Sequence, residues 1–177
     1  YVQVSYSNDD SFEWFGGTVN CSHLIAYRGV DDDFDTDFGY SGNVQFAFAV
    51  RDPNVWDGAS GGSSNGIESD NDGTGSAALP KTKPTFSNLT IIGPQTLVTG
   101  NQFSRGILLR RNTEHAVFNS VILGLWPNAG IRIDAQTTVD NATSGKLEIK
   151  NTHVAGVTTP LNSSIATFDP LNWFNTT

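Results

Sequence analysis

The stretch Gly29-Val-Asp-Asp-Asp-Phe-Asp-Thr-Asp-Phe-Gly-Tyr-Ser-Gly42 places five aspartates within seven residues and interleaves them with aromatic residues. Such a density of carboxylates is not a hydrophobic core, and an isolated acidic run is usually a solvated loop. The same local pattern, however, recurs in Asn8–Trp14, Val30–Thr36 and Ser64–Asp70: a polar turn, an apolar residue, an acid and a small or aromatic residue. This recurrence indicates a repeated structural unit.

The apolar residue at the centre of each turn motif marks the repeat. The markers are Phe12, Phe34, Ile67, Ile107 and Ile131, at intervals of 22, 33, 40 and 24 residues. The two long intervals contain insertions, at 56–64 in the first and at 71–83 and 93–104 in the second. Without the insertions the period is roughly 22 to 25 residues, which is typical of one coil of a solenoid.

Short alternating or β-branched runs bounded by Gly, Asn and Asp predict strands, and no window of eleven or more residues has helical periodicity. Strands are expected at Val2–Tyr6, Leu24–Tyr27, Val44–Val50, Leu89–Ile92, Val117–Leu123 and Leu147–Lys150. We therefore predict an all-β fold, a right-handed parallel β-helix of about five coils with loop insertions. An antiparallel β-sandwich is the competing fold, but it gives no reason for equivalent positions to recur in type.

The 177 residues have the length of one domain. We expect residues 1–177 to form a single β-helix domain that is the C-terminal part of a longer solenoid, because the chain starts directly in a strand pattern. Residues 157–177 are the candidate C-terminal cap, since an open coil displays unpaired backbone groups. An uncovered first coil would allow copies to stack end to end into a fibre.

Charge and composition limit the partners. The net charge is -8 and the chain has only ten Lys and Arg residues, which argues against a nucleic-acid partner. No apolar run approaches the ~20 residues that span a bilayer, so no membrane span is expected. Cys21 is the single cysteine, which excludes an internal disulfide framework. An extracellular chain of this kind needs another stabiliser, such as a bound metal.

The repeats align acids on neighbouring coils. Glu13, Asp35 and Glu68 occupy one position, and Asp37 and Asp70 align two residues further on. Stacked carboxylates repel one another by about 1 kcal/mol or more at partly shielded sites. Calcium would compensate this repulsion because it takes six to eight oxygen ligands, whereas three histidines and one cysteine make zinc or copper a poor fit.

The predicted calcium ligands are Asp31, Asp33, Asp35 and Asp37, supported by Glu13, Glu68 and Asp70. The alternative is that these carboxylates are simply hydrated, or paired with Arg28 and Arg51.

Three segments carry a resemblance to a known family: Asn-Asp-Asp-Ser-Phe-Glu-Trp-Phe-Gly-Gly-Thr-Val at 8–19, Asp-Asp-Asp-Phe-Asp-Thr-Asp-Phe-Gly-Tyr-Ser-Gly at 31–42, and Ser-Asn-Gly-Ile-Glu-Ser-Asp-Asn-Asp at 64–72. They resemble secreted bacterial surface proteins of the pectin-lyase-like, right-handed β-helix type, strongly over residues 1–70 and weakly beyond. The resemblance implies an extracellular or cell-surface β-helix, and for this group the biochemical role is mostly unassigned.

Two functions remain open. The first is a non-catalytic surface, adhesion or structural module that is stabilised by calcium and associates with itself or with polysaccharide. The alternative is a calcium-dependent lyase or a glycoside hydrolase that acts on acidic polysaccharide, with Arg51 or Arg28 as the base of a lyase, or Asp35 with Glu68 or Asp70 as the carboxylate pair of a hydrolase. No catalytic residue is assigned, because the fold alone does not imply the function.

Two tryptophans are candidate carbohydrate-binding residues. Trp56 and Trp126 lie in segments rich in turn residues, and exposed indole rings would stack on sugar rings. If the rings are buried they anchor loops instead, an interpretation that fits Trp126 better.

Overall fold

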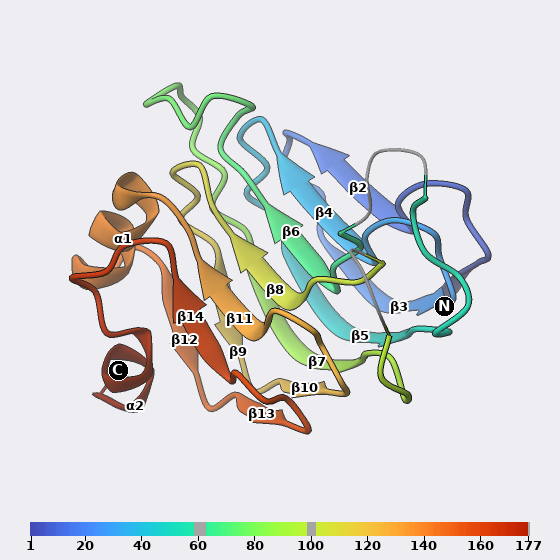
Figure 1. The fold of residues 1–177 in the computed structure, drawn as a ribbon. Helices are drawn as coiled ribbons and strands as arrows, with labels where there is room; N and C mark the ends of the chain where they lie inside the picture. The colour runs from blue at the N-terminus through green and yellow to red at the C-terminus, as the bar shows by residue number, and fades with distance from the viewer. Residues whose placement is uncertain (59–62, 99–101, 177) are drawn as a thin grey trace.

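Two parallel sheets build the fold, and the chain passes from one to the other in each repeat (Figure 1). The computed structural model describes residues 1–58, 63–98 and 102–176. Sheet B contains β2 (Phe12–Phe15), β4 (Phe34–Asp37), β6 (Ile67–Ser69), β8 (Arg105–Leu109), β11 (Ala129–Ile133) and β14 (Leu161–Ser163), in that spatial order. Each strand of sheet B pairs in parallel with the next, which excludes the antiparallel sandwich.

Sheet A is the second layer. Its strands are β1 (Val2–Ser5), β3 (Cys21–Tyr27), β5 (Asn43–Val50), β7 (Thr85–Ile92), β9 (Ala116–Phe118), β10 (Val121–Leu123), β12 (Glu148–Lys150) and β13 (His153–Ala155). From β7 onward the sheet continues as two short ladders, with β9 and β12 in one and β10 and β13 in the other. The parallel-strand, all-β class predicted from the sequence is thus confirmed.

The repeat markers are in register, as predicted. Phe12 pairs with Phe34, Phe34 with Ile67, Ile67 with Ile107, and Ile107 with Ile131. The last four are fully buried, and the rings of Phe12 and Phe34 stack with their centroids 5.7 Å apart. A further marker, Leu161, pairs with Ile131 and was missed because a polar Asn-Ser-Ser segment follows it. This column of inward side chains forms the sheet B side of the core.

Glycine precedes three of these markers for a steric reason. A Cβ atom on Gly66 would lie 2.5 Å from the carbonyl oxygen of Gly106, and one on Gly106 would lie 2.6 Å from the carbonyl oxygen of Gly130. Any side chain here would push neighbouring strands apart. The glycines therefore allow the close approach of successive strands of sheet B.

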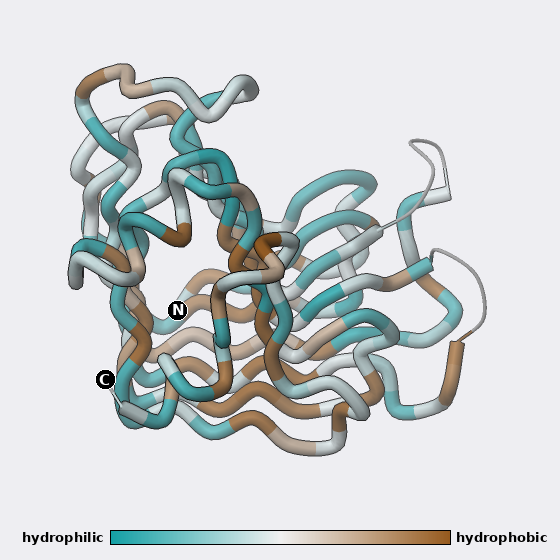
Figure 2. Tube along the Cα trace, turned by 60° about the vertical axis from the view of Figure 1, so that its left-hand side comes forward, coloured by the Kyte–Doolittle hydropathy of each residue, from teal (hydrophilic) through white to brown (hydrophobic). Residues whose placement is uncertain are grey.

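Sheet A supplies the other half of the core and bends at one residue per repeat. Ala26, Ala49, Ile91 and Ile122 stack in register and are fully buried. The bend residues have positive φ values of 50° to 58°; they are His23, Phe46, Asn88, Asn119 and Asn151. Figure 2 shows hydrophobic segments recurring from strand to strand, while the connecting loops are mostly hydrophilic.

Two short helices follow late strands of the chain. The sequence pattern predicted that helix would be at most a minor component. α1 (Gln136–Thr143) connects β11 to β12 and buries Val139 and Ala142 against the core. α2 (Pro170–Thr176) lies against β14 in the segment predicted as a cap. Its Trp173 is 8% exposed and donates its indole N–H to the carbonyl oxygen of Ala142, at 3.1 Å.

The predicted insertions lie in the connections that lead from a strand of one sheet to a strand of the other. Residues 59–62 and 99–101, which belong to two of them, are outside the described residues. The insertion at 71–83 projects at the top of Figure 1. The side-chain amide of Asn71 closes this loop by donating to the carbonyl oxygens of Ser76 and Ala78. The pairing of β5 with β7 and of β6 with β8 stays in register on either side of these insertions.

Candidate functional site

The outer surface of sheet B carries the acidic repeats. Glu13 pairs with Asp35, and Asp35 with Glu68, as the alignment on the markers predicted. Two residues further along the chain, Asp37 ends β4 and Asp70 directly follows β6. The backbone N–H of Asp70 donates a hydrogen bond to the carbonyl oxygen of Thr36, so Asp70 continues the alignment with Asp37. Inward neighbours are apolar or small, so strand alternation directs these acids away from the core. We call Asp10, Glu13, Asp35, Asp37, Glu68 and Asp70 the acidic face.

Carboxylate oxygens lie close together beside β2 and β4. Asp10, Glu13 and Asp35 form one group of three in which one oxygen from each residue lies within 4.8 Å of the others. Asp9, Asp10 and Asp31 form a second such group. The two groups share Asp10, and their spacing suits several oxygen ligands around a single cation.

Burial and mutual repulsion raise the pKa values on this face. The pKa of Asp35 is raised to about 9, first by burial and then by the neighbouring charges of Glu68 and Asp10. Burial raises the pKa of Asp10 to about 7, with Asp31 and Glu13 adding to the rise. Burial also raises the pKa values of Glu13, Asp31, Asp37 and Glu68. The face therefore resists full ionisation at neutral pH.

The residues present fit a hard cation. Oδ1 of Asp35 is buried and has no hydrogen-bond partner among the described residues. An orphaned carboxylate oxygen costs free energy unless a donor or a cation meets it. Glu13 and Asp10 lie within reach of the same point, and the group contains only oxygen donors. This is the donor set that calcium prefers.

The seven predicted metal ligands are distributed over three environments. Glu13, Asp31 and Asp35 belong to the two close groups. Asp37, Glu68 and Asp70 lie on the same face outside these groups, and Asp70 is paired with Arg110 and Arg111 at 2.9 and 2.7 Å. Asp33 points to the interior instead, where it meets Arg51 at 3.0 Å with both side chains fully buried.

Sequence reasoning missed Asp9 and Asp10. Their signal was the alignment of Asn8–Trp14 with Val30–Thr36, which places Asp10 opposite Asp32. The structure shows this pairing as a hydrogen bond from the backbone N–H of Asp32 to Oδ1 of Asp10, at 2.9 Å. Asp32 is itself buried, and burial with nearby acids raises its pKa well above the usual range.

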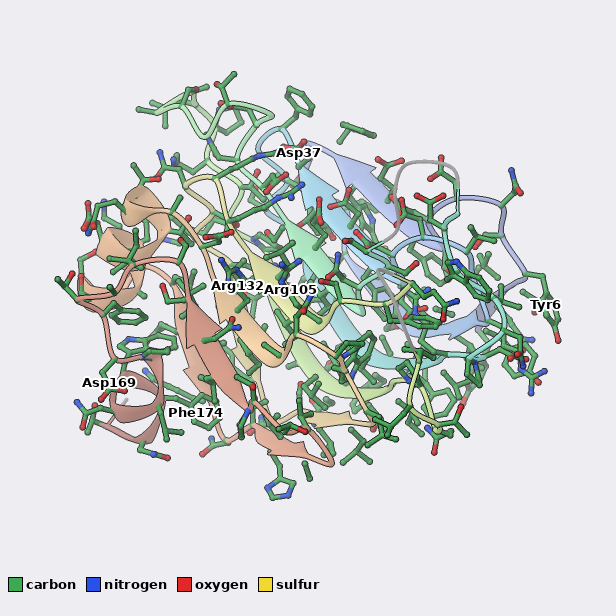
Figure 3. All side chains as sticks on the ribbon, viewed as in Figure 1. Tyr6, Asp37, Arg105, Arg132, Asp169 and Phe174 are labelled. Atoms are coloured by element: carbon green, nitrogen blue, oxygen red, sulfur yellow. The ribbon has the colours of Figure 1, made fainter. Side chains whose placement is uncertain are left out.

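Arginines replace the acids on the later strands of sheet B. Arg105 lies on β8 and Arg132 lies on β11 (Figure 3). Arg110 directly follows β8. Arg110 bridges to the acidic face by binding both Glu68 and Asp70. Arg132 contacts Asp134 at 3.3 Å, whereas Arg105 makes no ion pair among the described residues. We call the outer surface of β8, β11 and β14 the arginine half.

The arginines suggested from the sequence as a base do not face the acids. Arg51 is 2% exposed and its guanidinium group donates to the carbonyl oxygens of Gly29 and Asn65, besides pairing with Asp33. A group so enclosed cannot meet a substrate. Arg28 pairs with Asp52 and donates to the hydroxyl of Tyr6. Burial therefore excludes Arg51 as the base of a lyase, whereas Arg28 is partly exposed and follows β3 of sheet A, away from the acids of sheet B.

The two tryptophans pack into the fold. Trp126 is 2% exposed and donates its indole N–H to the carbonyl oxygen of Leu123, at 2.9 Å. Its ring lies where a Cβ atom of Gly93 would be, so it offers no free face to a sugar and anchors its loop. The prediction that Trp126 binds carbohydrate is corrected accordingly. Trp56 is partly buried against the core.

A family model described as a pectate-lyase like beta helix domain matches residues 1–177. The chain belongs to this family. No curated protein and no solved structure gives a significant match. The parallel pairing of every strand agrees with the family's β-helix.

This pectate-lyase like domain thus combines a cluster of acids with a cluster of arginines on one sheet. The acids could hold a cation, and the arginines could hold an anion. Within the described residues, no helix of the domain is long and apolar enough to cross a membrane.

Proposed function

We propose that the chain is an extracellular, non-catalytic surface module, a right-handed β-helix of about five coils whose acidic face binds calcium and which attaches to polysaccharide. The family match supports the β-helix part of this proposal, and it supports the extracellular part because pectate-lyase-like domains are typically extracellular. The single observation that carries the cation part is the buried, unpartnered oxygen of Asp35 inside a group of three carboxylates.

Each acid has a defined task in this proposal. Asp35 supplies the buried ligand oxygen, and Glu13 and Asp10 supply oxygens from the neighbouring strand and turn. Asp31 extends the group through Asp10. A bound calcium ion would neutralise the repulsion that raises the pKa values of these carboxyl groups. Because the ligands must ionise first, calcium binding should release protons and strengthen as the pH rises.

Thermal melts with calcium and with chelator test the proposal. Calcium that binds only the folded chain at about one hundred times its Kd adds about 2.7 kcal/mol. For a chain of this length that is a rise in Tm of roughly 5 to 10 °C. The substitution Asp35→Asn should remove most of the rise, since the amide keeps the shape but loses the charge.

Asp140→Asn is the matched control. Asp140 is exposed on α1, away from the acidic face, so its substitution should leave the calcium response unchanged. An unchanged Tm of the wild-type chain on addition of calcium would contradict the proposal. The size of the same samples reports whether copies stack end to end.

A second candidate function is a calcium-dependent lyase on acidic polysaccharide. The observation that favours it is Arg105 on β8, which forms no ion pair among the described residues and whose pKa is lowered by burial and by the charge of Arg132. Arg105 lies two strands from Asp35 in sheet B, and a lyase requires a base that can reach the substrate held by the cation. Incubation of the domain with polygalacturonate and calcium, followed by ultraviolet absorbance of unsaturated ends, distinguishes the two functions. Chain cleavage that Arg105→Gln abolishes would favour the lyase.

A glycoside hydrolase is the remaining alternative. With a pKa of about 9, Asp35 keeps its proton at neutral pH, as a general acid must. Release of reducing ends without unsaturated ends in the same incubation would identify this reaction.

A further inference from the structure

We infer that the chain forms a two-fold homodimer in which the outer face of sheet A packs against the same face of a second copy. The face consists of side chains that the strands of sheet A direct away from the core. They stand in two columns that follow the strand register: Ile25, Phe48, Thr90 and Val121 in one, and Tyr27, Val50, Ile92 and Leu123 in the other. This surface lies apart from the acidic face.

Strand alternation directs the two columns outward. The column between them points to the core, where Ala26, Ala49, Ile91 and Ile122 are fully buried. The side chains of both outer columns are at least partly exposed. Phe48 is 38% exposed, and Phe46 at the bend of the same strand is 48% exposed. The outer face of sheet A therefore presents apolar side chains to solvent.

This face carries almost no charge, although the chain has a net charge of -8. Among the described strands of sheet A only β12 contains charged residues, and these two, Glu148 and Lys150, pair with each other. At the margin of the face Arg28 pairs with Asp52, at 3.0 Å. The outer surface of sheet B, in contrast, carries the acidic face and the arginine half. A contiguous apolar surface on an otherwise charged molecule marks an interaction site.

A second copy of the chain is the partner that this chemistry fits. The two columns contain no cation to hold an anionic lipid or glycan, and the net charge of the chain would repel either. Most of the side chains are aliphatic, so they offer no ring for a sugar to stack on and pack best against other apolar side chains. A second copy supplies the same apolar surface, which a two-fold axis makes complementary to itself. The acidic faces then lie on opposite sides of the dimer.

The size of the face suits a stable dimer. Six strands lie side by side from β1 to β13, and the longest have 8 residues. At ~4.8 Å between strands and ~3.3 Å per residue, the face measures roughly 24 by 26 Å, about 600 Å². Specific interfaces bury about 600 to 1,000 Å² on each partner, so the face reaches the lower end of this range. Two sheets that pack in this way lie ~10 Å apart.

Sedimentation velocity in chelator, over a series of protein concentrations, tests the dimer in the absence of calcium. The wild type should sediment as a dimer at micromolar concentration and dissociate on dilution. Phe48→Glu places a carboxylate near the middle of the face in each copy. We expect its dimer Kd to rise about tenfold or more, because like charges that face each other across an interface are strongly disfavoured.

Thr90→Glu separates association from folding. Thr90 is in register with Phe48 on the neighbouring strand, so the substitution adds the same charge without removing an aromatic ring. It should weaken the dimer as Phe48→Glu does. Both positions are at least partly exposed, and both variants should keep the far-ultraviolet circular dichroism spectrum of the wild type.

Phe38→Glu is the matched control. Phe38 is 56% exposed and directly follows β4 of sheet B, so the same substitution there should leave the dimer Kd unchanged. A wild type that is monomeric at every concentration would overturn the inference. Folded variants of Phe48 and Thr90 that associate as tightly as the wild type would also overturn it, since another surface would then be the interface.

The measured mass distinguishes this dimer from end-to-end stacking. A two-fold interface closes at two copies, whereas stacked coils continue to grow, so growth beyond two copies would contradict the face-to-face dimer. A monomeric wild type that binds neutral lipid vesicles or neutral dextran through Phe48 would assign the face to another partner and overturn the dimer. Failure of calcium to raise Tm would contradict the proposed cation site and leave the dimer standing, since the mass is measured in chelator.

Discussion

The two halves of the outer surface of sheet B share one backbone and differ in charge. At the same register position the early strands carry Glu13, Asp35 and Glu68, and the later strands carry Leu108, Arg132 and Asn162. The inward marker column runs through both halves without a break. The β-helix therefore fixes the positions of outward side chains while leaving their chemistry free, and the charge changes sign between β6 and β8.

Arg110 holds the two halves together. It binds Glu68 and Asp70 from the end of β8, and Arg111 adds a second contact to Asp70. Among the residues that the structure describes, Glu13, Asp35 and Asp37 form no ion pair, and the pKa of Asp35 is raised to about 9. Compensation of the acidic face thus falls with distance from the arginine half, which is why its β2 and β4 end is the candidate cation site.

The largest expected loss of stability comes from substitution of Asp33, the acid that points inward and does not belong to the acidic face. Asp33→Asn leaves the charge of Arg51 buried and unpaired, and breaking a buried pair in this way costs about 3 to 5 kcal/mol. Urea unfolding near pH 8 measures the loss. The double variant Asp33→Asn with Arg51→Met should recover part of it, because the uncompensated charge is gone. A single variant that unfolds at the wild-type urea concentration would overturn the assigned role of the pair.

An intermediate effect concerns pH in the absence of cations. The folded-state pKa values of Asp35 and Asp10 are raised to about 9 and about 7, whereas unfolded carboxyl groups titrate near pH 4. Between these values these two groups bind more protons in the folded chain than in the unfolded chain, so their contribution to stability is largest at low pH and falls as the pH rises. In chelator, Tm should fall by several degrees from about pH 5 to about pH 8.5.

Calcium should flatten this pH profile, since it holds the ionised carboxylates, and Asp35→Asn should flatten it in chelator. A Tm that rises over this range in chelator would show that the acids are compensated within the chain. The profile thus measures how far the acidic face depends on an ion that the arginine half does not need.

The smallest expected effect is at the boundary itself. Arg110→Gln removes the bridge from β8 to Glu68 and Asp70, and we expect a loss of about 1 kcal/mol because the side chain is partly exposed. The more exposed pair of Lys150 with Glu148 on sheet A provides the control: Lys150→Gln should cost clearly less. If Arg110→Gln and Lys150→Gln lower the free energy of unfolding equally in urea, Arg110 has no special role at the boundary.

Sequence reasoning identified the fold class and the acidic positions because both depend on local repetition. Five markers and three aligned acids could be read from turn motifs, and the structure pairs them in that register. The position of Asp33 could not be read in this way. Whether an acid points inward depends on a partner such as Arg51, which lies 18 residues further along the chain and is a residue type normally expected at the surface.

The arginine half was also missed for a physical reason. The later repeats carry no acid after the marker, so the motif that defined the repeat disappears where the charge changes. α1 lies within a connection between the sheets, where no repeat constrains the sequence. Trp126 was ambiguous because burial of a loop residue depends on tertiary contacts, here the ring over Gly93.

The single-residue bend of sheet A has a consequence for how such a chain can change. His23, Phe46, Asn88, Asn119 and Asn151 turn the sheet with one left-handed residue each, so no repeat differs in length at this corner. All the length variation lies in the connections between the sheets. The bend therefore has the same length in every repeat. Asparagine or glycine in place of Phe46 would relieve the strain of a left-handed backbone conformation, which costs other residues about 1 kcal/mol. A new segment grafted at 71–83 would enlarge the surface of the molecule without disturbing the strands that carry it.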